Sequence, residues 1–138
     1  MFKIFSKCET KKLLHAINRV SDFEGRKDLV DPENFIQLAS LNFEKGKTFR
    51  PHIHLWKDIN YKKIIAQESW VVISGSVKVL FYDLDKSLLH TDILYKGDCS
   101  LTFHGGHNYE ILEDNTLVYE FKTGPYDGQI SDKIFIDD

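Results

Sequence analysis

The sequence predicts a single-domain all-β protein, and three observations support that prediction. Turn signals recur about every ten residues from Phe35 onward. The runs between them are short and rich in β-branched and aromatic residues, which are the residues that favour strands. No helical segment separates these runs, and this disfavours a parallel sheet with helical crossovers. Several short strands at this spacing are typical of an all-β sandwich or barrel.

The expected strands begin at residue 35 and continue to residue 123. They are Phe35–Phe43, Ile64–Ser74, Val77–Tyr82, Leu88–Leu94, Ser100–Phe103, Tyr109–Leu112 and Leu117–Lys122. Glycine, proline, asparagine and aspartate mark the turns between them, as in Gly75-Ser76 and Gly105-Gly106. We therefore expect a β-sandwich or barrel over residues 35–123 and a tail over residues 124–138.

The first 34 residues have a different pattern. Apolar residues recur at helical spacing between Thr10 and Val20, namely at Leu13, Leu14, Ile17 and Val20. This spacing predicts a short amphipathic helix. The following segment, Ser21–Asn34, is polar and contains Pro32, so it is expected to be a connector. The helix and connector should pack outside the barrel.

Composition excludes several classes of protein. The chain of 138 residues is 42% hydrophobic and 28% charged, which is ordinary for a soluble globular domain. Its net charge of −3 gives no electrostatic reason to expect nucleic acid or an anionic membrane as partner. No apolar run is long enough to span a membrane or resembles a signal region, so we expect a cytoplasmic protein. Cys8 and Cys99 are read as unpaired thiols.

Four residues have the chemistry of a metal site. His52 and His54 are two positions apart, so on a strand both imidazoles point to one face. Glu68 precedes a strand-like run, and His107 follows a glycine turn. Three imidazoles and one carboxylate that converge make a borderline metal site with open coordination positions. We predict that His52, His54, Glu68 and His107 bind one divalent transition metal ion.

The spacing of these residues resembles the cupins, which are small double-stranded β-helix (jelly-roll) barrels. The first cupin motif is a glycine, five residues, His-X-His, three or four residues, glutamate, six residues and glycine. Five residues separate Gly46 from His52, and six residues separate Glu68 from Gly75. The departure is the gap of thirteen residues between His54 and Glu68, which suggests a loop inserted at the mouth of the barrel.

The second cupin motif is matched in part. Gly97 opens it and Gly105 stands where the second glycine belongs, but Phe103 replaces the motif's proline. The histidine comes one position early, at His107, and His104 is a competing ligand because it lies just before the glycine turn. The resemblance covers residues 35–123 and implies a cupin barrel with a short helix before it, together with a bound metal.

The whole chain also resembles small single-domain cupins that are often found among polysaccharide or sugar-nucleotide genes. A six-coordinate ion such as Fe(II), Mn(II), Ni(II) or Co(II) held by four ligands keeps two open positions, whereas Zn(II) prefers fewer ligands plus water. Such an ion polarises a hydroxyketone, so that a nearby base moves a proton between adjacent carbons. Tyr109 or Glu110 is the predicted proton-transfer group, with Glu120 on a neighbouring strand. The predicted substrate contacts are Arg50, Trp56 and Tyr61.

Three function classes follow from these residues. The first is a metal-dependent isomerase or epimerase acting on a carbohydrate or sugar nucleotide. The second is an Fe(II)-dependent dioxygenase, and the third is a non-catalytic cupin that binds a small, oxygen-rich molecule. Open sheet edges invite pairing, and cupins commonly form dimers. We therefore also predict a homodimer that uses the N-terminal arm or the first strand, Phe35–Phe43.

Overall fold

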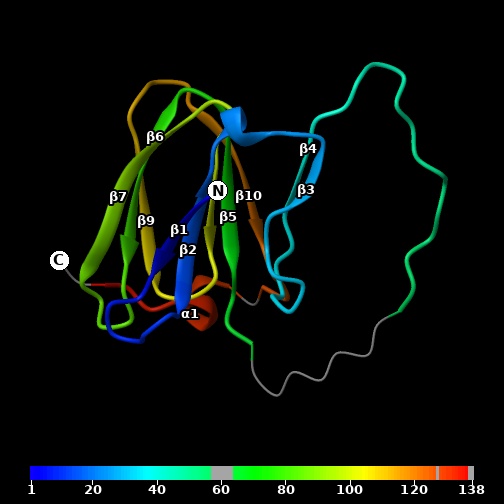
Figure 1. Cartoon of the computed structure of the whole chain (residues 1–138). Coiled ribbons are helices and arrows are strands. Elements are labelled where there is room, and N and C mark those ends of the chain that lie inside the picture. The colour runs from blue at the N-terminus through cyan, green and yellow to red at the C-terminus, as the bar shows by residue number, and fades with distance from the viewer. Residues whose placement is uncertain (57–63, 127, 137–138) are drawn as a thin grey trace.

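The structure is a computed structural model that describes residues 1–56, 64–126 and 128–136. Within these ranges the chain is mostly β-structure (Figure 1). The strands are β1 (Phe2–Phe5), β2 (Leu13–Asn18), β3 (Arg26–Asp28), β4 (Ala39–Leu41), β5 (Glu68–Ser74), β6 (Ser76–Tyr82), β7 (Leu88–Tyr95), β8 (Cys99–Thr102), β9 (Gly106–Ile111) and β10 (Leu117–Lys122). A 3-10 turn, η1 (Val20–Asp22), and a short helix, α1 (Gln129–Asp132), complete the described elements.

The strands form three antiparallel sheets. The five-stranded sheet has the order β1-β2-β8-β5-β10, the three-stranded sheet has the order β7-β6-β9, and β3 pairs with β4. The two larger sheets share one hydrophobic core, to which Ile17 and Val72 come from the first sheet and Val79 and Phe81 from the second. Because these side chains are at most 1% exposed, each contributes roughly 1.5–3 kcal/mol through burial.

The outer face of the five-stranded sheet has a second apolar layer. Leu101 and Phe103 point to that face, where Leu29 and Val30 from the segment between β3 and β4 cover them. The sheet is therefore buried on both sides over β2 and β8. Its far edge, β10, lacks this cover and is mostly exposed.

The helix predicted between Thr10 and Val20 is wrong, because this segment contains strand β2. β2 pairs with β1 on one side and β8 on the other, so that His15 lies opposite Thr102. Every residue from Leu14 to Asn18 is buried. A strand covered on both faces loses the alternation of polar and apolar residues, and its apolar positions then match a helical spacing by chance.

The strands predicted after residue 64 agree with β5 to β10 to within a few residues at each end. The predicted first strand, Phe35–Phe43, is only partly formed, because pairing is limited to Ala39–Leu41. After the last strand the chain forms α1, which lies across one end of the two larger sheets (Figure 1). Among the described residues, no helix is long and apolar enough to cross a membrane.

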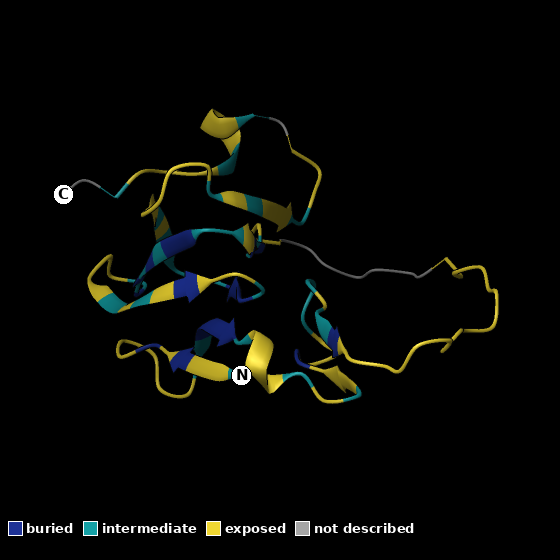
Figure 2. Ribbon diagram, turned by 90° about the horizontal axis from the view of Figure 1, so that it is seen from above, coloured by how far each residue is buried: buried dark blue, intermediate teal, exposed yellow. Residues whose placement is uncertain are grey.

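Residues 43–56, which we call the arm, leave the body of the molecule after β4 (Figure 1). Every arm residue is exposed, in contrast to the buried strands in the body of the molecule (Figure 2). Phe43 and Phe49 contact each other at 5.5 Å between ring centroids, and Lys47 lies over both rings. Among the described residues, each hydrogen bond and ring contact of an arm residue is made with another arm residue.

Candidate interior site between the sheets

A carboxylate and an imidazole meet between the two larger sheets. Glu68 begins β5 in one sheet, and His107 follows the first residue of β9 in the other. The Nε2 atom of His107 lies 3.1 Å from the Oε1 atom of Glu68. The two side chains are 22% and 11% exposed respectively, so the pair is partly open to solvent at this end of the molecule.

A tight turn sets the position of His107. Gly105 has a φ of +84°, and a Cβ atom there would lie only 2.6 Å from the carbonyl oxygen of Tyr82. Only glycine satisfies both conditions without strain. The turn leads into β9, in which His107 pairs with Phe81 and Tyr109 with Val79. Since Phe81 and Val79 point into the core, His107 and Tyr109 also face inward.

Aromatic and hydroxyl groups surround the Glu68–His107 pair. The Nε1 atom of Trp70 donates to the same Glu68 oxygen at 3.0 Å. The rings of Trp70 and Tyr109 stack at 4.0 Å and 8°. The hydroxyls of Tyr109 and Ser100 lie 2.9 Å apart. We call Glu68, Trp70, Ser100, His107 and Tyr109 the interior cluster.

Electrostatics fixes the charge of two cluster members. Burial on its own raises the pKa of Glu68, but the hydrogen bond from His107 and the positive charge of Lys133, among other contacts, outweigh it and lower the pKa below the usual value. Glu68 is therefore ionised at neutral pH and accepts hydrogen bonds. Burial raises the pKa of Tyr109 well above its usual value, so its hydroxyl stays protonated. The cluster thus holds one acceptor carboxylate and one phenol that can donate.

The second nitrogen of His107 is one of five buried side-chain atoms that have no hydrogen-bond partner among the described residues, and it is the one that lies in the interior cluster. Nδ1 is buried and has no hydrogen-bond partner among the described residues. Because Nε2 faces an ionised carboxylate, the neutral imidazole carries its proton there and Nδ1 has a free lone pair. Buried polar groups nearly always have a partner, so this atom marks a place where a ligand group is expected.

The predicted metal ligands are brought together only in part. Glu68 and His107 form the pair described above, whereas His52 and His54 contact each other on the arm, with ring centroids 5.0 Å apart. Across the described residues, no group of three or more histidine, cysteine, aspartate or glutamate side chains is placed to hold a metal ion. Within one chain the described residues therefore do not bring the four predicted ligands to one point.

The other predicted site residues lie in different surroundings. Glu110 faces away from the interior and pairs with Lys78 at 2.9 Å, so only Tyr109 of the two predicted proton-transfer residues reaches the cluster. His104 is half-buried in the turn before β9, and no contact joins it to Glu68. Arg50 and Trp56 are exposed on the arm, and Tyr61 lies outside the described residues.

Two residues near the pair were not predicted. Ser100 lies opposite Trp70 in the pairing of β8 with β5, and Lys122 lies opposite Glu68 in the pairing of β10 with β5. Lys122 bonds Asp132 of α1 at 3.1 Å, which ties the C-terminal segment to this end of the sheets. Alternation along the predicted strands was the available signal, but it identifies these neighbours only once the strand order is known.

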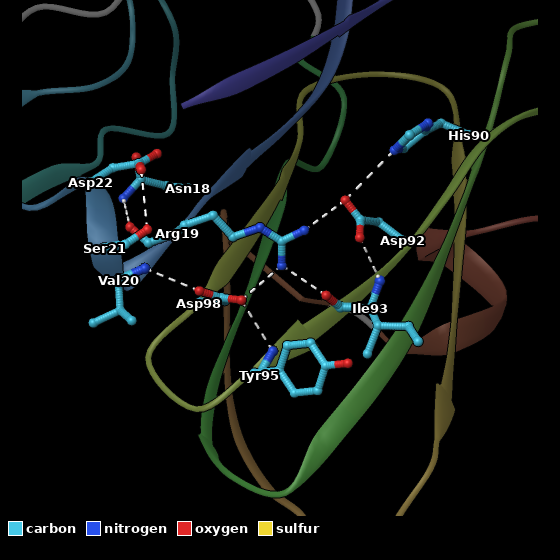
Figure 3. Close-up of polar contacts among 10 residues, drawn as sticks. All are labelled: Asn18, Arg19, Val20, Ser21, Asp22, His90, Asp92, Ile93, Tyr95 and Asp98. Carbon is cyan, nitrogen blue, oxygen red and sulfur yellow. Dashed lines mark hydrogen bonds and ion pairs between the residues drawn. The ribbon is translucent and has the colours of Figure 1, made fainter.

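A surface depression elsewhere on the molecule is lined by a network of paired charges. It measures about 760 Å³, is open to solvent and is lined in part by Arg19, Asp92 and Asp98. The guanidinium of Arg19 bonds both carboxylates at 2.7 Å, and Asp98 also accepts from the backbone N–H groups of Val20 and Tyr95 (Figure 3). The charges of Arg19, Asp92 and Asp98 are thus paired with one another, and the network joins the end of β2 to β7.

The interior cluster is therefore the better candidate site. It combines a carboxylate–imidazole hydrogen bond, a stacked aromatic pair and an unsatisfied nitrogen at one end of two packed sheets. Comparison of the chain with protein-family models, curated proteins and solved structures finds no match.

Proposed function

We propose that this protein is a small jelly-roll barrel of cupin type that moves a proton within a carbohydrate or sugar nucleotide, as an isomerase or epimerase does. The observation that supports the reaction is the arrangement at His107, whose Nε2 is held by Glu68 while Nδ1 has no described partner. The motif spacing and the two sheets around one core support the fold.

His107 is the proposed general base. A carboxylate that fixes the Nε2 proton makes Nδ1 the accepting nitrogen and stabilises the imidazolium formed when it takes a proton. The proton comes from a carbon next to a carbonyl, which leaves an enediolate. For isomerisation, Tyr109 protonates the former carbonyl oxygen and takes up the proton of the neighbouring hydroxyl, while His107 returns the carbon-bound proton to the former carbonyl carbon. For epimerisation, a water molecule protonates the original carbon on its opposite face as the carbonyl re-forms, and His107 releases its proton to solvent.

Tyr109 is the proposed donor to the substrate oxygen. Its hydroxyl is protonated at neutral pH because burial raises its pKa, and it lies on the same inward face of β9 as His107. The stacked rings of Trp70 and Tyr109 form a flat apolar wall of the kind on which a sugar ring packs. These contacts favour a ring-shaped, oxygen-rich substrate over a charged peptide.

A thermal-shift screen followed by isotope exchange tests this proposal. We expect a sugar nucleotide to raise the melting temperature, and the bound ligand to exchange a carbon-attached hydrogen for deuterium in D2O. His107→Gln keeps a donor towards Glu68 but has no basic nitrogen, so exchange should fall about 10²–10⁴-fold. Glu110→Gln is the matched control, because Glu110 faces away from the cluster and pairs with Lys78. Unchanged exchange in His107→Gln would refute the assignment.

The metal ion predicted from the sequence is a separate proposal. Elemental analysis of the purified protein should give close to one equivalent of a divalent transition metal per chain, and His52→Ala should remove most of it. A protein that stays metal-free after reconstitution contradicts it. Anaerobic loading with Fe(II) followed by oxygen-uptake measurements tests the dioxygenase alternative, for which oxygen consumption coupled to loss of an organic substrate is the required result.

A further inference from the structure

We propose that the arm pairs with the β10 edge of a second copy of this chain, and that the second copy returns its own arm in the same way. His52 and His54 of one chain then stand beside the interior cluster of the other, so the candidate site is shared between two chains. What this placement does for catalysis rests on the proposed function, whereas the pairing itself does not.

The arm has the composition of a buried segment but lies in solvent. Ile53, Leu55 and Trp56 are 92%, 86% and 102% exposed. They follow one another closely, and Figure 2 shows this segment exposed along its whole length. Contiguous apolar exposure of this kind marks an interaction surface, because single exposed apolar residues are common but clusters are not.

Strand β10 offers a matching surface. It is the last strand of its sheet, and among the described strands it pairs only with β5. The other side of β10 has no pairing with a described strand, and such an edge is a template for another strand. The outward residues Leu117, Tyr119 and Phe121 are 59%, 63% and 57% exposed. An added strand would pair along this edge and cover these side chains.

Alternation decides where the histidines go. On an extended arm Ile53 and Leu55 share one face, while His52 and His54 share the other. If the first pair packs on the outward Tyr119 and Phe121, the histidines face the inner side of the sheet, where Glu68 lies. Strands are about 4.8 Å apart, so the arm would lie roughly 10 Å from β5, with Lys122 of β10 next to Glu68 between them.

The amount of exposed apolar surface points to a second copy as the occupant. The apolar side chains of one arm expose on the order of 600 Å², since a single aromatic residue accounts for 150–250 Å². Two arms, together with the two edges they cover, exceed the roughly 1,200 Å² that a stable interface needs. In a single chain the arm leaves the body without pairing with β10, so both surfaces stay uncovered (Figure 1). A two-fold exchange covers both at once.

Charge favours the same exchange. The arm carries Lys45, Lys47 and Arg50 against Glu44, a net charge of +2. The whole chain has a net charge of −3, so the rest of the chain carries −5, which is −3 minus 2. A basic arm is therefore attracted to the acidic body of another copy, most strongly at low salt.

A pair of cysteines tests the contact. In a Cys8→Ser background, Ile53→Cys and Tyr119→Cys placed in one chain should oxidise to a covalent dimer on a denaturing gel. The matched control joins Ile53→Cys with Ile130→Cys, because Ile130 is 99% exposed but lies on α1. The control should stay monomeric. A disulfide within one chain, or none in either pair, overturns the proposal.

Light scattering at micromolar concentration gives the second readout. The unmodified protein should have twice the chain mass of 16.1 kDa, and Ile53→Asp or Tyr119→Asp should return it to one chain mass. Ile130→Asp should leave the dimer intact. A monomeric unmodified protein, or a dimeric Ile53→Asp variant, overturns the exchange. A dimer that no sugar nucleotide stabilises refutes the proposed function alone, and a monomer that sugar nucleotides stabilise refutes the exchange alone.

Discussion

The N-terminal strands and the arm are both rich in apolar residues, yet they are buried to opposite extents. Leu14 and Ile17 in β2 are fully buried, whereas Leu55 in the arm is 86% exposed. β2 has a strand neighbour on each side, and the described contacts of the arm lie within it. The difference teaches that apolar residues become buried where the backbone is paired on both sides, because a strand held within a sheet offers both of its faces to other segments that pack on it.

Polar contacts fasten the N-terminal strands as well. The carboxylate of Asp83 accepts hydrogen bonds from the Ser6 hydroxyl and the Lys7 N–H, each at 2.6 Å. Arg19 bonds Asp92 and Asp98 at 2.7 Å at the other end of the same hairpin. The region is thus held to the three-stranded sheet at both ends, while no described contact of this kind holds the arm.

The largest expected difference between the two regions is in the free energy of unfolding, when one leucine in each region is replaced by alanine. Leu14→Ala should lower the free energy of unfolding by about 2–5 kcal/mol, because it leaves a cavity beside a fully buried strand. Leu55→Ala, made in the Ile53→Asp background so that the arm is undocked, should change it by less than about 0.5 kcal/mol. Urea denaturation measures both, and equal effects would mean that the arm is packed within its own chain.

A pH titration sharpens the comparison through His15, the buried histidine of β2. Burial lowers its pKa from 6.5 to about 4, and the ring stacks on Phe81 and contacts Thr102 and the Tyr82 carbonyl. The unfolded chain binds the proton more tightly, so stability is complete above pH 6.5 and falls as the pH drops towards 4. The loss is about 3 kcal/mol for a shift of this size.

Unfolding free energies measured from pH 7 to pH 4 check this prediction. His15→Gln should remove most of the slope, because its side chain does not titrate. A slope that survives the substitution would assign the pH dependence to another group.

The smallest expected effect is a difference in stability between two arginine-to-lysine substitutions. Arg19→Lys should cost about 1–2 kcal/mol, since lysine cannot reproduce the forked contacts to two carboxylates and the Ile93 carbonyl. Arg26→Lys removes the geometry of an exposed pair with Asp28 and should change stability by only a few tenths of a kcal/mol. Thermal melts of both variants give the ranking, and a reversed order would count against the N-terminal anchoring described above.

The sequence predicted the later strands well because β5 to β10 keep turn residues at their ends and alternate where one face is exposed. It failed at β2, where burial of both faces hides the alternation. The alternation of side-chain directions along a strand also predicted that one of Tyr109 and Glu110 points inward. The pairing of Tyr109 with Val79 was needed to decide which, and that pairing depends on contacts distant in sequence.

The candidate site, like the fold, was predicted from the sequence only in part. Glu68 and His107 are set by ordered strands and do come together. The course of His52 and His54 was not predictable, because thirteen residues separate them from the ordered β5 and no turn signal fixes their direction. Local sequence determines which residues share a strand face, but not which other chain segment covers that face.

The short turn before β9 has a consequence for how this protein tolerates insertions and deletions. Removing one residue between His104 and His107 would exchange the two faces of β9, so that Asn108 and Glu110 would point inward in place of His107 and Tyr109. The length of this turn is therefore constrained by the need to keep His107 and Tyr109 on the inner face of β9. The arm has no such register with the described strands, so related sequences should differ in length there, before Glu68, while keeping the spacing from Gly105 to Tyr109 unchanged.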